Sequence, residues 1–138
     1  MKTVISRYPY VPAEWIVAHG FTPRGMTPNL GNESARRWRG VGEGVCAYAK
    51  ACLSQGLAET DVIAVVFSTV CDQMRRIAEV FSINSDVPMF LFNVPTACRI
   101  PSAPKLYLSE LRRLGRFLER LGGCSPTPQR LAEVMFHY

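Results

Sequence analysis

The residues of this chain with the clearest chemical potential are cysteines that stand where helices are expected to begin. In "VVFSTVCDQMRR" (65–76), an apolar run ends in small polar residues, and Cys71 comes just before the next predicted helix. Cys46 lies in the first turn of another predicted helix, and Cys98 follows a second apolar run. A thiol in such a place can fill space, react or hold a metal, and the residue types alone leave these three uses open.

Holding a metal would require several of these side chains to meet at one site. The helix dipole favours the thiolate form of a cysteine at a helix N-terminus, and thiolates bind soft metals and iron–sulfur clusters. Cys46 and Cys71, with Cys98 as a further candidate, would hold such a cluster if they converge. Ser68 and Thr69 precede Cys71, and they would either hydrogen-bond the cluster sulfide or the substrate, or merely end a strand.

The other cysteines and the histidines do not extend this set. The five cysteines are odd in number and contain no CxxC pair, which excludes a zinc ribbon or a thioredoxin motif. Cys52 lies on the apolar stripe of its predicted helix and is expected in the core, whereas Cys124 follows two glycines in a turn. His19 and His137 are far apart in sequence. Because no signal peptide is recognised, free thiols favour a reducing compartment and a cytoplasmic protein.

Length and charge narrow the class of protein. A chain of 138 residues, 48% hydrophobic and 20% charged, indicates one globular domain. The net charge of +5 comes largely from segments 34–40 and 109–123, but aromatic residues do not interleave with them as in RNA-binding proteins. We therefore expect no nucleic-acid partner. The longest apolar run, Val62 to Phe67, is far shorter than a membrane span, so we expect no membrane association.

The elements that must position the cysteines alternate between helix and strand. Residues 21–29 are expected to be a loop or an edge strand, and residues 32–40 a loop or a short helix. This alternation predicts a single α/β lobe over residues 1–138, with an open parallel sheet of three to four strands flanked by helices, flavodoxin-like or Rossmann-like. Ligands of such sheets bind outside the carboxyl ends of the strands. The predicted helices are 11–20, 44–57, 72–82, 103–123 and 127–138, and the predicted buried strands are 61–68 and 87–95.

From about Tyr10 to Met135 the chain resembles the 2-hydroxyacyl-CoA dehydratase family, which includes benzoyl-CoA reductase subunits. "YVPAEWIVAHGFTPRGM" resembles the opening helix and strand of the family, and "CAYAKACLSQGL" resembles its first cysteine helix. "VVFSTVCDQMRRIAEVF" resembles its second cysteine motif, in which Cys-Asp-x-Met-Arg is the most specific element. "MFLFNVPTA" and "LYLSELRRLGRFLERLGG" resemble the strand and long helix that follow.

The resemblance implies two flavodoxin-like lobes with a [4Fe–4S] cluster between them, held by three cysteines. Cys46 and Cys71 match the first two cluster ligands. The family's third ligand belongs to a second lobe that is absent here, so the resemblance implies a D-component-like first lobe that needs a second lobe or a partner subunit. Cys98 is the candidate third ligand within this chain. A separate ATP-hydrolysing activator would inject one electron at low potential, and a ketyl radical of the acyl-CoA thioester would lose its hydroxyl.

The function expected from this resemblance is an iron–sulfur component of a 2-hydroxyacyl-CoA dehydratase, or of a related acyl-CoA reductase, that is incomplete alone. One alternative is a truncated lobe that binds a partner without a complete cluster, and another is a plain small-ligand α/β domain. Arg75 and Arg76 would meet a CoA phosphate or a partner, or else form a solvated face. Tyr10 and Glu14 lie in the opening motif without an assigned role, and His19 is expected to be structural.

Overall fold

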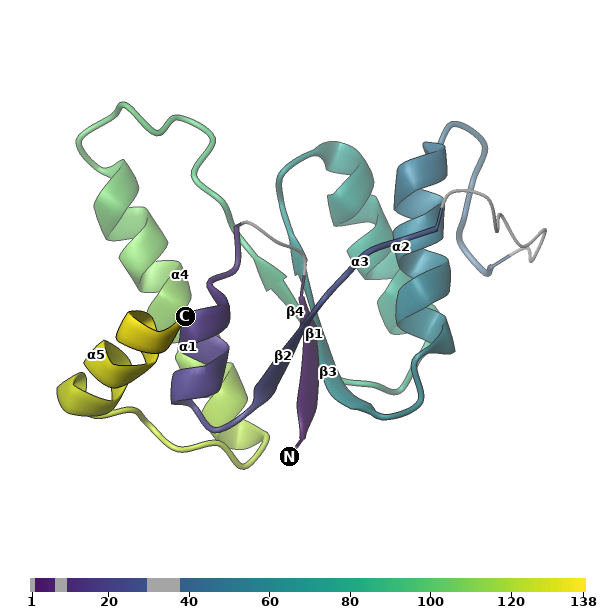
Figure 1. Ribbon diagram of the computed structural model, residues 1–138. Helices are drawn as coiled ribbons and strands as arrows, with labels where there is room; N and C mark the ends of the chain where they lie inside the picture. Colours follow the sequence, from purple (N-terminus) through teal and green to yellow (C-terminus); the bar gives the residue numbers. More distant parts are fainter. Residues whose placement is uncertain (1, 7–9, 30–37) are drawn as a thin grey trace.

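A computed structural model describes residues 2–6, 10–29 and 38–138, which form a four-stranded parallel sheet with helices on both faces (Figure 1). The strand order is β2-β1-β3-β4, and each neighbouring pair is parallel. The elements in chain order are β1 (Thr3–Ser6), α1 (Ala13–Ala18), β2 (Thr22–Gly25), α2 (Ala47–Ala58), β3 (Val62–Ser68), α3 (Asp72–Asn84), β4 (Met89–Phe92), α4 (Ala103–Arg120) and α5 (Pro128–His137).

The predicted α/β class with a parallel sheet is confirmed, but the sequence prediction omitted one strand. β1 pairs with both β2 and β3, so it lies inside the sheet and is buried at all four positions. The order 2-1-3-4 matches the start of the flavodoxin-like doubly wound order. This order reverses direction at β1, because α1 leads to β2 on one side and α2 leads to β3 on the other.

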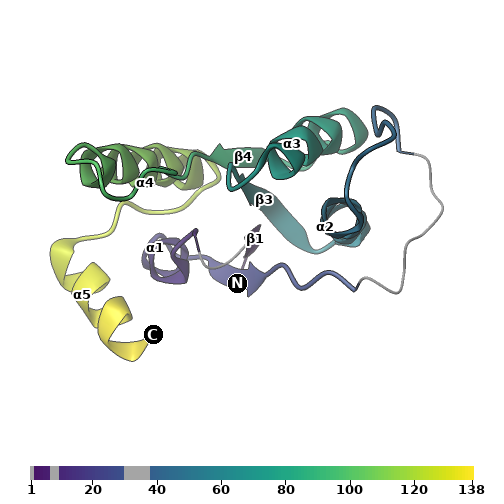
Figure 2. The same cartoon turned by 90° about the horizontal axis from the view of Figure 1, so that it is seen from above.

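Side chains alternate between the two faces of the sheet. Val65 and Phe67 of β3 pack under α2 and α3, whereas Ala64 and Val66 pack under α1 and α4. Figure 2, viewed along the sheet, shows these two helix pairs on opposite sides. A run of β-branched residues therefore fills two cores at once, as expected for a parallel strand covered on both faces. α5 packs outside this arrangement, against α1.

Several predicted boundaries shift by a few residues. The expected strand 87–95 is shorter in the structure, because the chain leaves the sheet after Phe92. The alternative of an edge strand within 21–29 is confirmed as β2, where Pro23 is tolerated because one side of the strand has no partner. Most of the segment 32–40 lies outside the described residues, and its last three residues form an irregular turn.

α4 is the longest described helix and is strongly amphipathic. Leu114, Phe117 and Leu118 are buried on its inner face, while Arg112, Arg116 and Arg120 are exposed. Gly115 allows a close approach from α1, because a Cβ there would lie 3.0 Å from His19 Nε2. None of the described helices combines the length and the apolar character needed to cross a membrane.

Candidate functional site at the carboxyl edge of the sheet

The sheet presents a crevice at the point where its strand order reverses. β1 and β3 lie side by side, and their crossover helices leave toward opposite faces. Outside the carboxyl ends of such strands, no connection covers the sheet edge, which makes this edge the usual ligand position in open α/β folds. α2 and α3 both begin at this edge, the upper one in Figure 1. The first candidate site therefore consists of these strand ends and these helix starts.

Cys71 is the residue that precedes α3, and its side chain is exposed. Its backbone is extended, with φ −155° and ψ 165°, as expected for an N-cap residue. No side chain at this cap accepts a hydrogen bond from the helix, so the thiol of Cys71 has no capping role. The thiol is free to bind something outside the helix, in the positive field of the helix N-terminus.

Cys46 holds the same position on α2. It is the N-cap residue, its side chain is exposed, and its Sγ accepts a hydrogen bond from the Ala49 amide at 3.4 Å. Its own amide donates to Oε1 of Gln73 at 3.2 Å. Gln73 is only two residues after Cys71, so this bond joins the beginnings of α2 and α3 directly.

The structure thus brings Cys46 and Cys71 to neighbouring helix N-termini at one edge of the sheet. α2 and α3 pack side by side on one face of the sheet (Figure 1). Gln73 was not singled out from the sequence, because a side chain that bonds a backbone amide 27 residues away leaves no local pattern. Through this hydrogen bond, Gln73 positions the loop that carries Cys46.

Cys98 lies at the same edge but farther along the sheet, in the loop after β4. It is exposed, and its Sγ donates to the Pro95 carbonyl at 3.7 Å. Within the described part of the chain, no three His, Cys, Asp or Glu side chains are grouped so that they could hold one metal ion. A cubane iron–sulfur cluster is larger than one ion and takes each thiolate on a different iron, so its ligands need not surround a single point. The described residues do not complete the set.

Ser68 and Thr69 have different environments. Thr69 closes the end of the sheet, because its Oγ1 accepts from the Val94 amide at 3.0 Å and its amide donates to Phe92 O at 2.9 Å. Ser68 is fully buried, and its hydroxyl has no hydrogen-bond partner among the described residues. Buried hydroxyls without partners are uncommon in folded proteins.

Ser6 repeats this feature on the neighbouring strand. It ends β1, is fully buried, and its hydroxyl also lacks a partner in the described part of the structure. The sequence held a signal for it, because "TVIS" and "VVFS" are both apolar runs that end in serine. Ser6 and Ser68, whose hydroxyls have no hydrogen-bond partner among the described residues, thus end β1 and β3, the two strands at the reversal point.

Tyr107 joins α4 to the segment that follows β1. Its hydroxyl donates to the Tyr10 carbonyl at 3.1 Å, and its ring meets Phe92 edge-on at 5.5 Å between centroids. Burial raises the pKa of Tyr107, and the negative charge of Glu14 raises it further. This contact holds the start of α1 against α4 at the same edge of the sheet.

The remaining predicted residues have local contacts. Arg76 donates to the Gly40 carbonyl at 3.1 Å and pairs with Glu79 at 3.2 Å, whereas Arg75 is exposed. Arg76 therefore fastens the loop before α2 to the surface of α3. His19 is buried, and its Nδ1 donates to Trp15 O at 2.7 Å.

Comparison with known proteins agrees with these features. A search of curated proteins finds no match for the chain. The family model described as "2-hydroxyglutaryl-CoA dehydratase, D-component" matches residues 9–138, a range that includes both exposed N-cap cysteines and all of the sheet except β1. The chain therefore belongs to the 2-hydroxyglutaryl-CoA dehydratase D-component family.

Proposed function

We propose that this chain is the cluster-holding first lobe of a 2-hydroxyacyl-CoA dehydratase or of a related acyl-CoA reductase. The observation that carries the proposal is the placement of Cys46 and Cys71 as exposed N-cap residues of two adjacent helices at the reversal point of the sheet. The family match over residues 9–138 supports the reaction class. In this proposal Cys46 and Cys71 each bind one iron of a [4Fe–4S] cluster.

The bound cluster would supply low-potential one-electron transfer to an acyl-CoA thioester. The residues of the chain have separate tasks in this proposal. The two thiolates hold the cluster, and the adjacent helix N-termini favour its negative charge. The buried hydroxyls of Ser68 and Ser6 lie at the ends of β3 and β1, and the alternation of strand side chains directs them to the face covered by α1 and α4.

The third ligand must come from outside the Cys46–Cys71 pair. Cys98 is the candidate within the chain, because it is exposed beyond the end of β4. A second lobe or a partner subunit is the other source, and a separate ATP-hydrolysing activator would deliver the electron. The D-component family itself implies a partner component.

The described residues do not group three side chains that could hold one metal ion, and this favours one alternative function. In that alternative the chain is a non-catalytic lobe that binds a partner and holds no complete cluster. The two functions differ in whether the chain, together with its partner component, takes up iron and sulfide.

Anaerobic reconstitution with iron and sulfide separates these functions. We expect a brown protein with broad absorbance near about 400 nm, as thiolate-bound iron–sulfur clusters give. Iron content should fall to background in Cys46→Ser and in Cys71→Ser, and the buried Cys52→Ser should serve as the matched control that retains iron. A protein that stays colourless in the presence of its partner component would refute the proposal. Retention of full iron in Cys98→Ser would assign the third ligand to the partner.

A further inference from the structure

A cavity lies away from Cys46 and Cys71, between α1, α4 and the beginning of α5. Its volume is about 400 Å³, within the range of small-molecule sites. It opens near the end of α1, and α1 runs antiparallel to the strands, so the cavity is at the amino edge of the sheet. It also lies on the face covered by α1 and α4, not on the face covered by α2 and α3.

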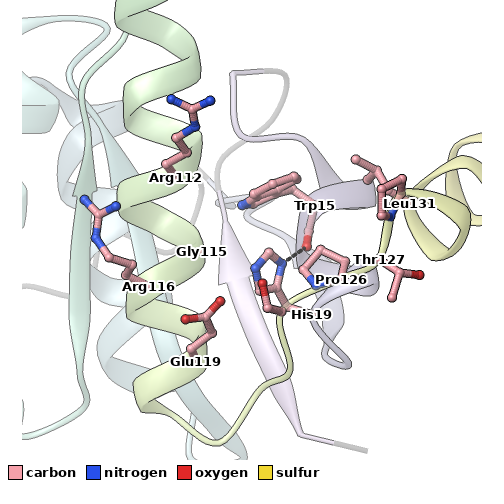
Figure 3. Close-up of a pocket in the computed structure, with 11 residues that line it drawn as sticks. Trp15, His19, Arg112, Gly115, Arg116, Glu119, Pro126, Thr127 and Leu131 are labelled. Carbon is pink, nitrogen blue, oxygen red and sulfur yellow. Dashed lines mark hydrogen bonds between the residues drawn. The ribbon is translucent and has the colours of Figure 1, made fainter.

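Trp15 supplies a buried donor to this cavity. Its Nε1 is buried and has no hydrogen-bond partner in the described part of the chain. His19 fixes the backbone beneath it through the 2.7 Å bond from Nδ1 to Trp15 O, and the two rings lie 4.9 Å apart between centroids. Figure 3 shows the indole nitrogen directed toward α4 at Gly115. An indole N–H can only donate, so its partner must be an acceptor.

Positive charge lies at the rim of the same cavity. Arg112 and Arg116, one turn apart on α4, line it, and neither forms an ion pair among the described residues. Arg113 between them differs, because it pairs with Glu110 at 2.9 Å. In Figure 3 Arg112 lies on the side of α4 near Trp15, whereas Arg116 points toward the other side of the helix. Of the two arginines that line the cavity, Arg112 is therefore the one on the Trp15 side of α4.

The rest of the wall is apolar. Pro126, Pro128 and Leu131 line the side of the cavity formed by the start of α5. Thr127 caps this helix, with its Oγ1 accepting from the Arg130 amide at 3.1 Å, so the positive end of α5 also faces the cavity. An occupant that satisfies this site has an apolar body and an anionic acceptor.

We propose that this cavity binds a small organic carboxylate with an apolar tail. One carboxylate oxygen accepts from Trp15 Nε1, the guanidinium of Arg112 pairs with the carboxylate, and the tail packs on Leu131 and the prolines. Carboxylate is favoured over phosphate because the wall is largely apolar and Glu119 offsets part of the positive charge. The site is independent of the proposed cluster, because it lies at the opposite edge and the other face of the sheet.

NMR titration of the ¹⁵N-labelled full chain tests this site. The probe is hexanoate, with hexanamide as the neutral control and inorganic phosphate as the control for charge alone. We expect hexanoate to shift the indole N–H resonance of Trp15 saturably, and a Trp38→Phe variant assigns the two indole signals. Hexanamide should bind at least about tenfold more weakly, because it offers no charge to Arg112.

Matched arginine variants complete the test. Arg112→Gln should weaken hexanoate binding by about tenfold, the effect of one lost charge-assisted hydrogen bond. Arg120→Gln, on the same helix but outside the cavity lining, should change the affinity by less than about twofold. The proposal is overturned if hexanoate leaves the Trp15 signal unmoved, if hexanamide or phosphate binds equally well, or if both arginine variants weaken binding to the same extent.

Discussion

At the scale of single residues, the two proposed ligands differ in what else they do. The Cys46 thiol accepts a capping hydrogen bond, whereas the Cys71 thiol does not. Cys46→Ala should therefore lower the free energy of unfolding by about 0.5 kcal/mol, and Cys46→Ser should leave it nearly unchanged, because serine is a good N-cap residue. Cys71→Ala should leave the free energy of unfolding unchanged, because the Cys71 thiol accepts no capping hydrogen bond. Urea denaturation of the iron-free proteins measures these differences, and an equal loss in both alanine variants would contradict the capping assignment.

Ser68 offers a second prediction at this scale. A buried hydroxyl without a partner costs stability, so Ser68→Ala should raise the free energy of unfolding of the iron-free protein by about 1 kcal/mol. Thr69→Val should lower it, because Thr69 Oγ1 accepts from the Val94 amide. Thermal unfolding of both variants checks the contrast. A destabilised Ser68→Ala protein would show that the hydroxyl has a structural partner.

The sequence predicted some residue environments and not others. Cys52 is fully buried, as its position on an apolar helical stripe predicted. The positions of Cys46 and Cys71 at helix starts also followed from local patterns, since capping and hydrophobic periodicity are local properties. Gln73 and Ser6 did not, because their roles depend on which strands and helices become neighbours.

At the scale of elements, β1 shows where local patterns fail. It has four residues, and its apolar content alone does not distinguish a strand from a loop. Its burial comes from pairing with β2 and β3 on both sides, which is a long-range property. β3 was predicted closely, because seven residues of continuous β-branched and apolar character are specific for a buried parallel strand.

Tyr107 carries a pH prediction for the contact between α1 and α4. Its pKa is raised in the folded state, so its contribution to stability is complete below about pH 10 and is lost as the pH rises toward the folded-state pKa. Tyr107→Phe should lower the free energy of unfolding at neutral pH by about 0.5 kcal/mol, through loss of the bond to Tyr10 O. The difference between the two proteins should shrink above about pH 10. Denaturant titrations at several pH values test this, and a constant difference would contradict it.

At the scale of the whole molecule, the two edges of the sheet have separate proposed roles. At the carboxyl edge, the exposed thiols of Cys46 and Cys71 lie where α2 and α3 begin, and the unpaired hydroxyls of Ser6 and Ser68 lie where β1 and β3 end. The amino edge has the cavity between α1, α4 and α5. The doubly wound topology could be predicted from alternating elements, but the cavity could not, because it depends on how α5 packs against α1.

Thiol alkylation read by mass spectrometry, before and after anaerobic cluster reconstitution, tests the central claim in the unmutated chain. Cys46, Cys71, Cys98 and Cys124 are exposed, so all four should react in the iron-free protein, and the buried Cys52 should not. In the cluster-loaded protein we predict that Cys46 and Cys71 become protected together while Cys124 reacts as before. Alkylation of Cys46 or Cys71 at an unchanged rate in the loaded protein would contradict their assignment as cluster ligands.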